Sequence, residues 1–305
     1  MGDRTPSREC NAVVIGLGSM GYGMAQSLLR AGFPVWGFDL DAAREEKLHG
    51  EGGLAASRAE AAQRADAVVS VVVNAAQTEA MLFGDDGIAP HMRPGAVFIS
   101  CATLAPEAAR GLASRLAPAG VDYLDAPISG GSARAAEGRL TMMASGSAQA
   151  FAKAAPALEA MAEMVFRLGE AVGAGSAMKI VNQLLAGVHI AAAAEAVTFA
   201  MTQGIGPAQA LDVISKCAGN SWMFENRVPH IVEGDYRPRS AVEIFVKDLG
   251  IVSDVARAAR FSAPLAAAAL QQFLAASGAG FGREDDAAVA KIYARNAGLT
   301  LPGEG

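Results

Sequence analysis

The chain has 305 residues, of which 52% are hydrophobic and 18% charged, and its formal net charge at pH 7 is -6. This composition is typical of a globular protein with a large core and excludes a largely disordered chain. The negative charge and the lack of Lys/Arg blocks argue against nucleic acid or a membrane as a partner. The polar N-terminal segment and three widely spaced cysteines, without a CxxC pair, predict a cytoplasmic protein.

Short β-branched segments alternate with Ala-rich segments through the first half of the chain. Residues 11–15 run into the turn Gly16-Leu17-Gly18-Ser19-Met20-Gly21 and then into an apolar-periodic stretch, an order that predicts a strand, a tight turn and a helix. Further strands are predicted at residues 35–38, 67–73, 96–100, 122–124, 140–144 and 165–168. The alternation predicts an α/β fold with a Rossmann-type, doubly wound parallel sheet.

The pattern changes beyond Gly169, where long apolar-periodic segments follow without an alternating strand. We predict an all-helical C-terminal domain, with the chain divided into residues 1–173 and 174–305, and a long interdomain helix at residues ~176–203. Polar residues interrupt the most apolar stretch, 180–201, so we expect a buried helix there rather than a membrane span.

The glycine-rich turn predicts a site for NAD. A GxGxxG string is weak evidence alone, but here it follows a predicted strand and opens a helix, so that Gly16 permits the bend, Gly18 lets a pyrophosphate approach and Gly21 lets helix pack on strand. Asp39 ends the second predicted strand, where a carboxylate binds ribose hydroxyls and repels a 2′-phosphate. Arg44, the nearest basic residue, could soften this preference for NAD over NADP. The alternatives are glycines that serve packing only, or a site for FAD or S-adenosylmethionine.

Two polar segments are candidates for the chemistry. Asp125-Ala126-Pro127-Ile128-Ser129-Gly130-Gly131-Ser132 follows a predicted strand, and its small residues leave backbone N–H groups free for an anion such as a carboxylate, although a plain turn fits equally well. In the second segment, residues 173–183, Lys179 and Asn182 are three residues apart and share a helix face. Apolar neighbours such as Met178, Ile180 and Val181 would partly desolvate the ammonium, but an exposed lysine at a helix start is the simpler interpretation from this segment alone.

The chain resembles the β-hydroxyacid dehydrogenase family, which includes 3-hydroxyisobutyrate dehydrogenase, tartronate semialdehyde reductase and, more distantly, 6-phosphogluconate dehydrogenase. The resemblance covers nearly the whole length. It rests on four motifs in order: the turn at residues 16–21, residues 125–131 with Gly138, residues 173–179 with Asn182, and Phe245-Val246-Lys247-Asp248-Leu249.

This resemblance implies roles for named residues. Lys179 would be the general base in alcohol oxidation and the general acid in carbonyl reduction, and Asn182 would orient a substrate hydroxyl. The substrate carboxylate would be held by Ser129, Gly130 and Gly131. Lys247 would reach both cofactor and substrate. Thr103 matches a threonine beside the nicotinamide. The chain departs from the family in the residues before it, Ser100 to Ala102, and has Asn74 where many members have proline. The loops that contain Asn74 and Thr103 are both expected to contact the cofactor.

A narrower likeness lies at residues 219–227, 234–236 and 74–79, which resemble the branch of the family that oxidises a four-carbon sugar acid with NAD. Asn220, Ser221 and Asn226 beside Trp222 would suit a polyhydroxylated acid. The equal alternative is a helix-capping turn with Trp222 in the core.

The remaining polar clusters have simpler interpretations. The four histidines are not at metal-ligand spacings, so no metal site is expected, and Glu284, Asp285 and Asp286 are predicted to cap a final helix.

We therefore predict NAD-dependent oxidation of a small hydroxy acid. The alternatives are the 3-hydroxyisobutyrate and tartronate semialdehyde activities and, from another class, an imine reductase-like or non-catalytic NAD-binding protein, against which Lys179 argues. A homodimer or homotetramer is also expected.

Overall fold

The structure, a computed structural model, describes residues 10–304 and divides into two compact units, Met1–Lys179 and Ile180–Gly305. The long helix α8, Ala174–Thr202, begins in the first unit and continues in the second. Lys179 is therefore the last residue of the first unit, whereas Asn182 and Lys247 belong to the second.

The first unit is built on a five-stranded parallel sheet, as predicted. Its strands are β1 (Ala12–Ile15), β2 (Val35–Phe38), β3 (Ala67–Ser70), β4 (Val97–Ser100) and β5 (Asp122–Asp125), in the spatial order β2-β1-β3-β4-β5. Side chains alternate between two buried faces: Ala12 and Val14 pack into one core, Val13 and Ile15 into another. Burial on both faces explains why these strands are continuous apolar runs.

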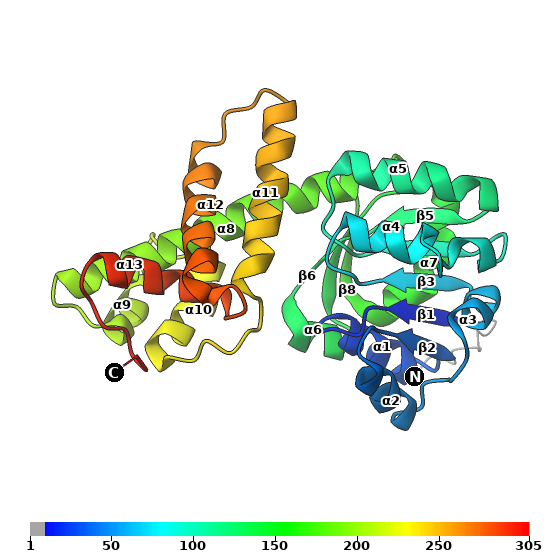
Figure 1. The fold of residues 1–305 in the computed structure, drawn as a ribbon, viewed down its shortest axis with the longest axis horizontal. Helices are drawn as coiled ribbons and strands as arrows, with labels where there is room; N and C mark the ends of the chain where they lie inside the picture. Colours follow the sequence, from blue (N-terminus) through cyan, green and yellow to red (C-terminus); the bar gives the residue numbers. More distant parts are fainter. Residues whose placement is uncertain (1–9, 305) are drawn as a thin grey trace. The chain divides into compact units, whose positions relative to one another are not determined.

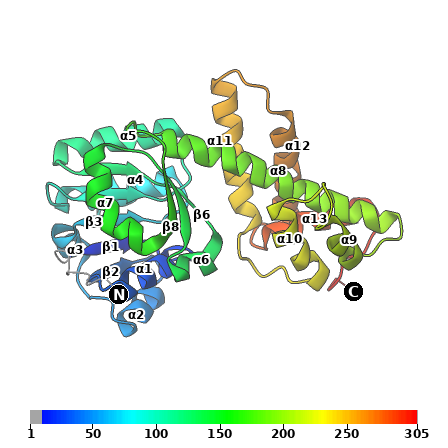
Figure 2. The same cartoon turned by 180° about the vertical axis from the view of Figure 1, so that it is seen from behind.

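Helices cover both faces of this sheet (Figures 1 and 2). One face carries α1 (Gly21–Arg30), α2 (Ala42–Gly50) and α7 (Ala148–Met161), and the other carries α3 (Arg58–Arg64), α4 (Ala75–Phe83) and α5 (Pro106–Leu116), with the 3₁₀ turns η1 (Ala89–His91) and η2 (Ala117–Ala119). Side-chain caps fix several helix starts: Asp41, Ser57, Asn74 and Ser147 each accept a backbone N–H of the following helix.

A second, smaller sheet, which was not predicted, accompanies the parallel one. It contains β6 (Ile128–Ser129), β7 (Leu140–Ala144) and β8 (Ala162–Arg167), with α6 (Gly131–Glu137) between β6 and β7, and β6 is antiparallel to β7. The two-residue strand β6 is too short for any periodicity to show in the sequence. A bridge joins the two sheets, because Asp125 and Ser145 exchange backbone hydrogen bonds of 3.0 and 2.8 Å.

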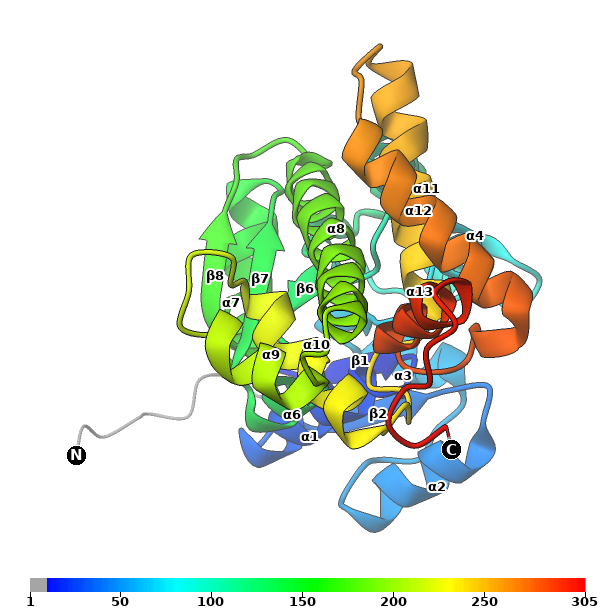
Figure 3. The same ribbon diagram turned by 90° about the vertical axis from the view of Figure 1, so that its left-hand side faces the viewer.

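The second unit is helical, as predicted. Beyond α8 it contains α9 (Pro207–Ile214), α10 (Trp222–Glu233), α11 (Val242–Ala258), α12 (Pro264–Ala276) and α13 (Ala290–Asn296), with the short turns η3 (Ser277–Phe281) and η4 (Asp286–Val289) (Figure 3). Side chains from α8 and the following helices form one core, which includes Ile190, Val228, Phe245 and Phe273.

Helix α8 is only partly buried, whereas a buried helix was predicted. By length and composition it could cross a membrane, but 44% of its most apolar window is buried inside the protein. Ile190 and Val197 lie in the core, while Val181, Leu185 and Phe199 are exposed. α8 is thus a core helix with one uncovered apolar side.

Candidate active site

The glycine turn between β1 and α1 has the geometry of a dinucleotide cradle. Gly16 has a φ of +94°, and a Cβ there would lie 2.5 Å from the Val71 carbonyl oxygen. A Cβ on Gly21 would lie 1.8 Å from the Gly16 carbonyl oxygen, so only glycine allows this contact between helix and strand. Gly18 has no such close contact, since the atom nearest to a Cβ placed there would be 3.8 Å away. The open side of the turn is therefore at the glycine expected to face the pyrophosphate.

Asp39 lies directly after β2 and contacts this turn. One carboxylate oxygen, Oδ2, accepts the Leu17 N–H at 2.6 Å, and Oδ1 accepts the Asp41 N–H at 3.0 Å. Arg44 lies 3.5 Å from Asp39 and 3.3 Å from Asp41, so the guanidinium is shared between two carboxylates. Asp39 thus links the end of β2 to the glycine turn.

Of the other residues in the turn, the Leu17 side chain is buried in the core, Ser19 is exposed, and Met20 packs partly against the core. Contacts of these three residues with a cofactor would therefore come from their backbone atoms.

Asn74 and Thr103 follow β3 and β4, so both lie at the same carboxyl edge of the sheet as Gly16 and Asp39. The Asn74 side chain caps α4 by accepting the Gln77 N–H at 2.9 Å. Thr103 is partly exposed. In a doubly wound sheet this edge is where nucleotides bind.

Asp125, at the end of β5, holds the start of α8. Its Oδ2 accepts the N–H groups of Gly173 at 3.0 Å and Ser176 at 2.8 Å, and Oδ1 accepts the Ser176 hydroxyl at 2.7 Å. The carboxylate is fully buried. Burial raises the pKa of Asp125, although these hydrogen bonds oppose the rise. In the sequence, Asp125 is recognisable only as part of a possible anion cradle. Its capping role joins positions 48 and 51 residues apart, which no local pattern reveals.

Close packing reinforces this junction. A Cβ on Gly175 would lie 2.4 Å from the Met143 carbonyl oxygen and 2.6 Å from that of Asp125. The Gly175 N–H donates to the Ser145 hydroxyl at 3.0 Å. The first turn of α8 is therefore fixed to both sheets of the first unit.

Lys179 lies one turn further along α8 and is buried, with 8% of its surface exposed. Its Nζ donates to the Ile128 carbonyl oxygen at 2.8 Å, next to Ser129. The interpretation of Lys179 as an exposed surface lysine is therefore wrong. Apolar neighbours on the helix were expected to desolvate the Lys179 ammonium. This is only partly right, because Ile180 is buried but Met178 and Val181 are about half exposed.

The Ser129 segment turns sharply after β6. Gly130 and Gly131 have φ values of +137° and +80°, a region that residues with side chains rarely adopt. Nothing lies within 4 Å of the position that a Cβ on Gly131 would occupy. The structure thus brings Lys179 to the Ser129 segment through Ile128, although the two are 51 residues apart.

In the second unit, four polar side chains form a chain of contacts. Gln183 donates to Asp248 at 2.5 Å, Lys247 forms an ion pair with Asp248 at 2.5 Å, and Asn182 donates to Gln183 at 2.9 Å. Asp248 and Gln183 are buried. Gln183 and Asp248 were not predicted as a pair. Their contact orients Asn182 and Lys247 within the same unit.

The segment that includes Trp222 is a helix cap, but Trp222 is not in the core. The Ser221 hydroxyl accepts the Phe224 N–H at 3.0 Å, and Asn220 donates to Glu225 at 2.7 Å. Trp222 is 60% exposed, whereas Phe224 is buried. The predicted helix cap is confirmed, whereas the alternative that placed Trp222 in the core is wrong.

The acidic run near the C-terminus also has a structural role. Asp285 caps η4, which leads into α13, and lies 2.8 Å from Nδ1 of the buried His230. Asp286 forms an ion pair with Arg227. Burial raises the pKa of Asp286 to about 6, although the neighbouring guanidinium favours the charged form. Within residues 10–304, no group of three or more His, Cys, Asp or Glu side chains could hold a metal ion.

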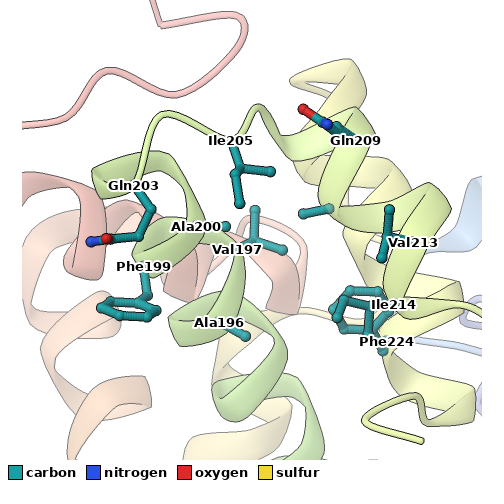
Figure 4. Close-up of a pocket in the computed structure, with 11 residues that line it drawn as sticks. Ala196, Val197, Phe199, Ala200, Gln203, Ile205, Gln209, Val213, Ile214 and Phe224 are labelled. Atoms are coloured by element: carbon teal, nitrogen blue, oxygen red, sulfur yellow. The ribbon is translucent and has the colours of Figure 1, made fainter. Parts of the chain in front are cut away.

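A hollow of about 370 Å³ in the second unit is almost entirely apolar (Figure 4). It is lined by residues of α8, α9, α10 and the loop between α8 and α9, among them Val197, Phe199, Ile205, Val213 and Phe224, with Gln203 and Gln209 as the polar members. No titratable side chain lines it, so it does not suit proton transfer.

The fold and the site define a nicotinamide-dependent dehydrogenase. A family model for the NAD binding domain of 6-phosphogluconate dehydrogenase matches residues 11–169, and one for NAD-binding of NADP-dependent 3-hydroxyisobutyrate dehydrogenase matches residues 173–293. The chain belongs to this β-hydroxyacid dehydrogenase family, and it is an NAD-dependent enzyme that acts on the CH–OH group of a small hydroxy acid.

Individual relatives match nearly the whole chain. It is 56% identical to L-threonate dehydrogenase of Cupriavidus necator, covering 96% of this chain and 98% of that protein. It is 50% identical to L-threonate dehydrogenase of Escherichia coli K12, covering 97% of each. A crystal structure described as 3-hydroxyisobutyrate dehydrogenase from Salmonella typhimurium has 51% identity and a TM-score of 0.88, covering 93% of this chain and 99% of that one.

Proposed function

We propose that the protein oxidises L-threonate to 2-oxo-tetronate with NAD, and that Lys179 is the general base. The observation that carries the catalytic part is the burial of Lys179, with Nζ held 2.8 Å from the Ile128 carbonyl oxygen. The substrate is supported by relatives of 50–56% identity that are L-threonate dehydrogenases.

In the proposed reaction, neutral Lys179 takes the proton of the substrate hydroxyl at Nζ while the C–H hydride leaves and the carbonyl forms. When bound, NAD would supply the acceptor for that hydride. In the reverse direction, the Lys179 ammonium returns the proton to the new hydroxyl. The Ile128 carbonyl oxygen supports this exchange, because it holds Nζ in place by accepting a hydrogen bond from it.

The remaining roles are proposals for binding. Ser129, Gly130 and Gly131 bind the substrate carboxylate, which suits the open space beside Gly131. Asn182 orients a substrate hydroxyl, and Lys247 contacts both the cofactor and the substrate. The contacts of both residues with the Gln183–Asp248 pair support a fixed orientation. Gly16 to Gly21, Asp39, Asn74 and Thr103 bind NAD.

Asp39 gives the first testable consequence. Asp39→Asn keeps an acceptor for the Leu17 N–H but removes the charge that favours ribose hydroxyls over a 2′-phosphate. We expect the ratio of kcat/KM for NAD to that for NADP to fall by roughly 10–100-fold, since hydrogen bonds to charged groups contribute about 1.5–3 kcal/mol. The matched control is Asp41→Asn, which removes the other carboxylate beside Arg44. An unchanged ratio in Asp39→Asn would remove the assigned role.

The substrate is tested by a panel of C3 to C6 hydroxy acids, including L-threonate, its stereoisomers, 3-hydroxyisobutyrate and tartronate semialdehyde with NADH. The measurement is kcat/KM for each, followed as NADH absorbance. L-threonate should give the highest value. If 3-hydroxyisobutyrate is oxidised and no C4 sugar acid is, the threonate assignment is wrong. The protein would then be a 3-hydroxyisobutyrate dehydrogenase, as the Salmonella structure is described.

We also propose a cytoplasmic homodimer or homotetramer. Exposed apolar side chains on α8 and α9, such as Leu185, Phe199 and Val213, support self-association, as does the apolar hollow shown in Figure 4.

A further inference from the structure

Gln183 and Asp248 are buried polar side chains that move no proton in the proposed reaction. Gln183 lies on α8 and Asp248 on α11, and their exposed fractions are 7% and 2%. The two helices approach closely here, since a Cβ on Gly187, one turn after Gln183, would lie 2.9 Å from the Leu249 side chain. This packing places Gln183 Nε2 2.5 Å from Asp248 Oδ2.

The contacts of Asp248 determine which way round the Gln183 amide lies. An amide group can present either its oxygen or its nitrogen to a neighbour. Asp248 Oδ1 forms an ion pair with Lys247 Nζ at 2.5 Å, and a carboxylate only accepts hydrogen bonds. Gln183 must therefore direct its nitrogen toward Asp248. Its oxygen, Oε1, then lies on the opposite side of the amide.

The orientation of the Gln183 amide in turn determines that of Asn182. Asn182 Nδ2 donates to Gln183 Oε1 at 2.9 Å. In the opposite orientation two amide oxygens would face each other, with no proton between them. The Asn182 carbonyl oxygen, Oδ1, therefore lies on the side of the amide away from Gln183. A carbonyl oxygen accepts hydrogen bonds, so this side of Asn182 suits an O–H donor.

We propose that Gln183 is a positioning residue, which fixes Asn182 so that its Oδ1 accepts a hydrogen bond from a substrate hydroxyl that is not oxidised. The reacting hydroxyl has one proton, and in the proposed reaction Lys179 takes it. The donor to Asn182 is therefore a second hydroxyl. This inference rests on the proposed function and specifies it further: the substrate is an acid with at least two hydroxyl groups.

L-threonate meets this requirement, because oxidation at C2 leaves the hydroxyls at C3 and C4 in place. 3-Hydroxyisobutyrate does not meet it, because its single hydroxyl is the one that is oxidised. An acid without the second hydroxyl leaves Asn182 Oδ1 without its donor. One such missing partner should weaken binding by about 10–100-fold. The arrangement thus favours polyhydroxylated acids over acids with one hydroxyl.

Gln183→Met tests the positioning role, because methionine keeps the length of the side chain and makes neither hydrogen bond. The measurement is kcat/KM with NAD for L-threonate and for 2-hydroxybutyrate of the same C2 configuration, which has the same chain length and no second hydroxyl. The ratio of the two values should fall by about 10–100-fold. The matched control is Gln203→Met, which replaces an exposed amide directly after α8 and should leave the ratio unchanged.

The melting temperature checks that Gln183→Met is folded. An unchanged ratio in the folded variant, whether both substrates lose activity or neither does, would overturn the inference. Failure of the proposed function is recognised separately, in wild type: no oxidation of L-threonate there would overturn that function and this inference with it.

A second test reads the polarity of Asn182 without changing Gln183. It uses analogues of L-threonate in which the hydroxyl at C3 or at C4 is replaced by hydrogen or by fluorine, which cannot donate a hydrogen bond. The dissociation constant of each acid from the complex of wild-type protein with NADH is measured by NADH fluorescence. At one of the two carbons, hydrogen and fluorine should both weaken binding by about 10–100-fold relative to L-threonate.

The same titrations with Asn182→Ala should show little difference between L-threonate and these analogues, because the acceptor is gone. A fluorine analogue that binds wild type as tightly as L-threonate at both carbons would show that no hydroxyl donates to Asn182, and would contradict the proposal. The same loss in wild type and in Asn182→Ala would contradict it too.

Discussion

Lys179→Ala should lower kcat for hydroxy-acid oxidation by about 10²–10⁴-fold, the usual contribution of general acid–base catalysis. The affinity for NAD should stay within a few-fold of wild type, because the glycine turn and Asp39 lie on other elements of the first unit. The value of kcat falls because the variant lacks the only proton acceptor that we assign at the site. The measurements are kcat from NADH formation and the Kd of NAD from tryptophan or NADH fluorescence.

The matched control for Lys179→Ala is Lys153→Ala. Lys153 belongs to the same unit and pairs with Asp122 at the start of β5, away from Asp125. Its replacement should leave kcat near the wild-type value, because partly exposed ion pairs contribute little. Substantial turnover in Lys179→Ala would end the assignment of this residue as general base.

Asp125→Ala should affect both stability and turnover. It leaves the Gly173 and Ser176 N–H groups and the Ser176 hydroxyl without their buried acceptor. One unpaired buried group costs about 1–3 kcal/mol, so the free energy of unfolding should fall by several kcal/mol. Because the same contacts fix the first turn of α8, kcat should fall by roughly 10²-fold in the folded protein, the effect of a small misplacement of a reacting group.

Two comparisons separate positioning from stability alone. Asp125→Asn keeps an acceptor for the backbone donors and should recover most of kcat, and Asp122→Asn, on the same strand, should leave kcat unchanged. Wild-type kcat in folded Asp125→Ala, assayed well below its melting temperature, would show that Asp125 does not position Lys179.

The pKa of Asp125 adds a pH dependence to this series. Burial raises the pKa of Asp125 in the folded chain above its unfolded value, so the folded state binds this proton more tightly. The free energy of unfolding of wild type, relative to Asp125→Asn, should therefore rise as the pH falls from 7 toward 4. Denaturant titrations of both proteins at several pH values measure this difference.

Much of the first unit could be predicted because its signals are local. Two strands have the predicted bounds, residues 35–38 and 140–144, and the glycine turn lies between a strand and a helix as expected. Lys179 could be selected by its motif, but its burial could not, because the contact that orients Nζ comes from Ile128, 51 residues earlier.

The contacts that could not be predicted from the sequence join residues that are far apart in the chain. Asp125 caps a helix that begins 49 residues later in the chain, and Gln183 meets Asp248 65 residues away. Trp222 shows the reverse case: a core position was one of two equal interpretations of this aromatic residue beside a cap, but Phe224, two residues further, is buried instead. Periodicity gives the helix but not which of two apolar residues near its start faces the core.

We propose that this chain removes a hydride from L-threonate with Lys179 as the base. The most direct test of this proposal is the initial rate of NADH formation from L-threonate and NAD, measured for wild type and Lys179→Ala side by side, with the organic product identified by NMR. We expect one molecule of 2-oxo-tetronate per NADH in wild type and almost no NADH formation in the variant. No NADH from L-threonate in a folded, NAD-binding wild-type protein, or an equal rate in the variant, would contradict it.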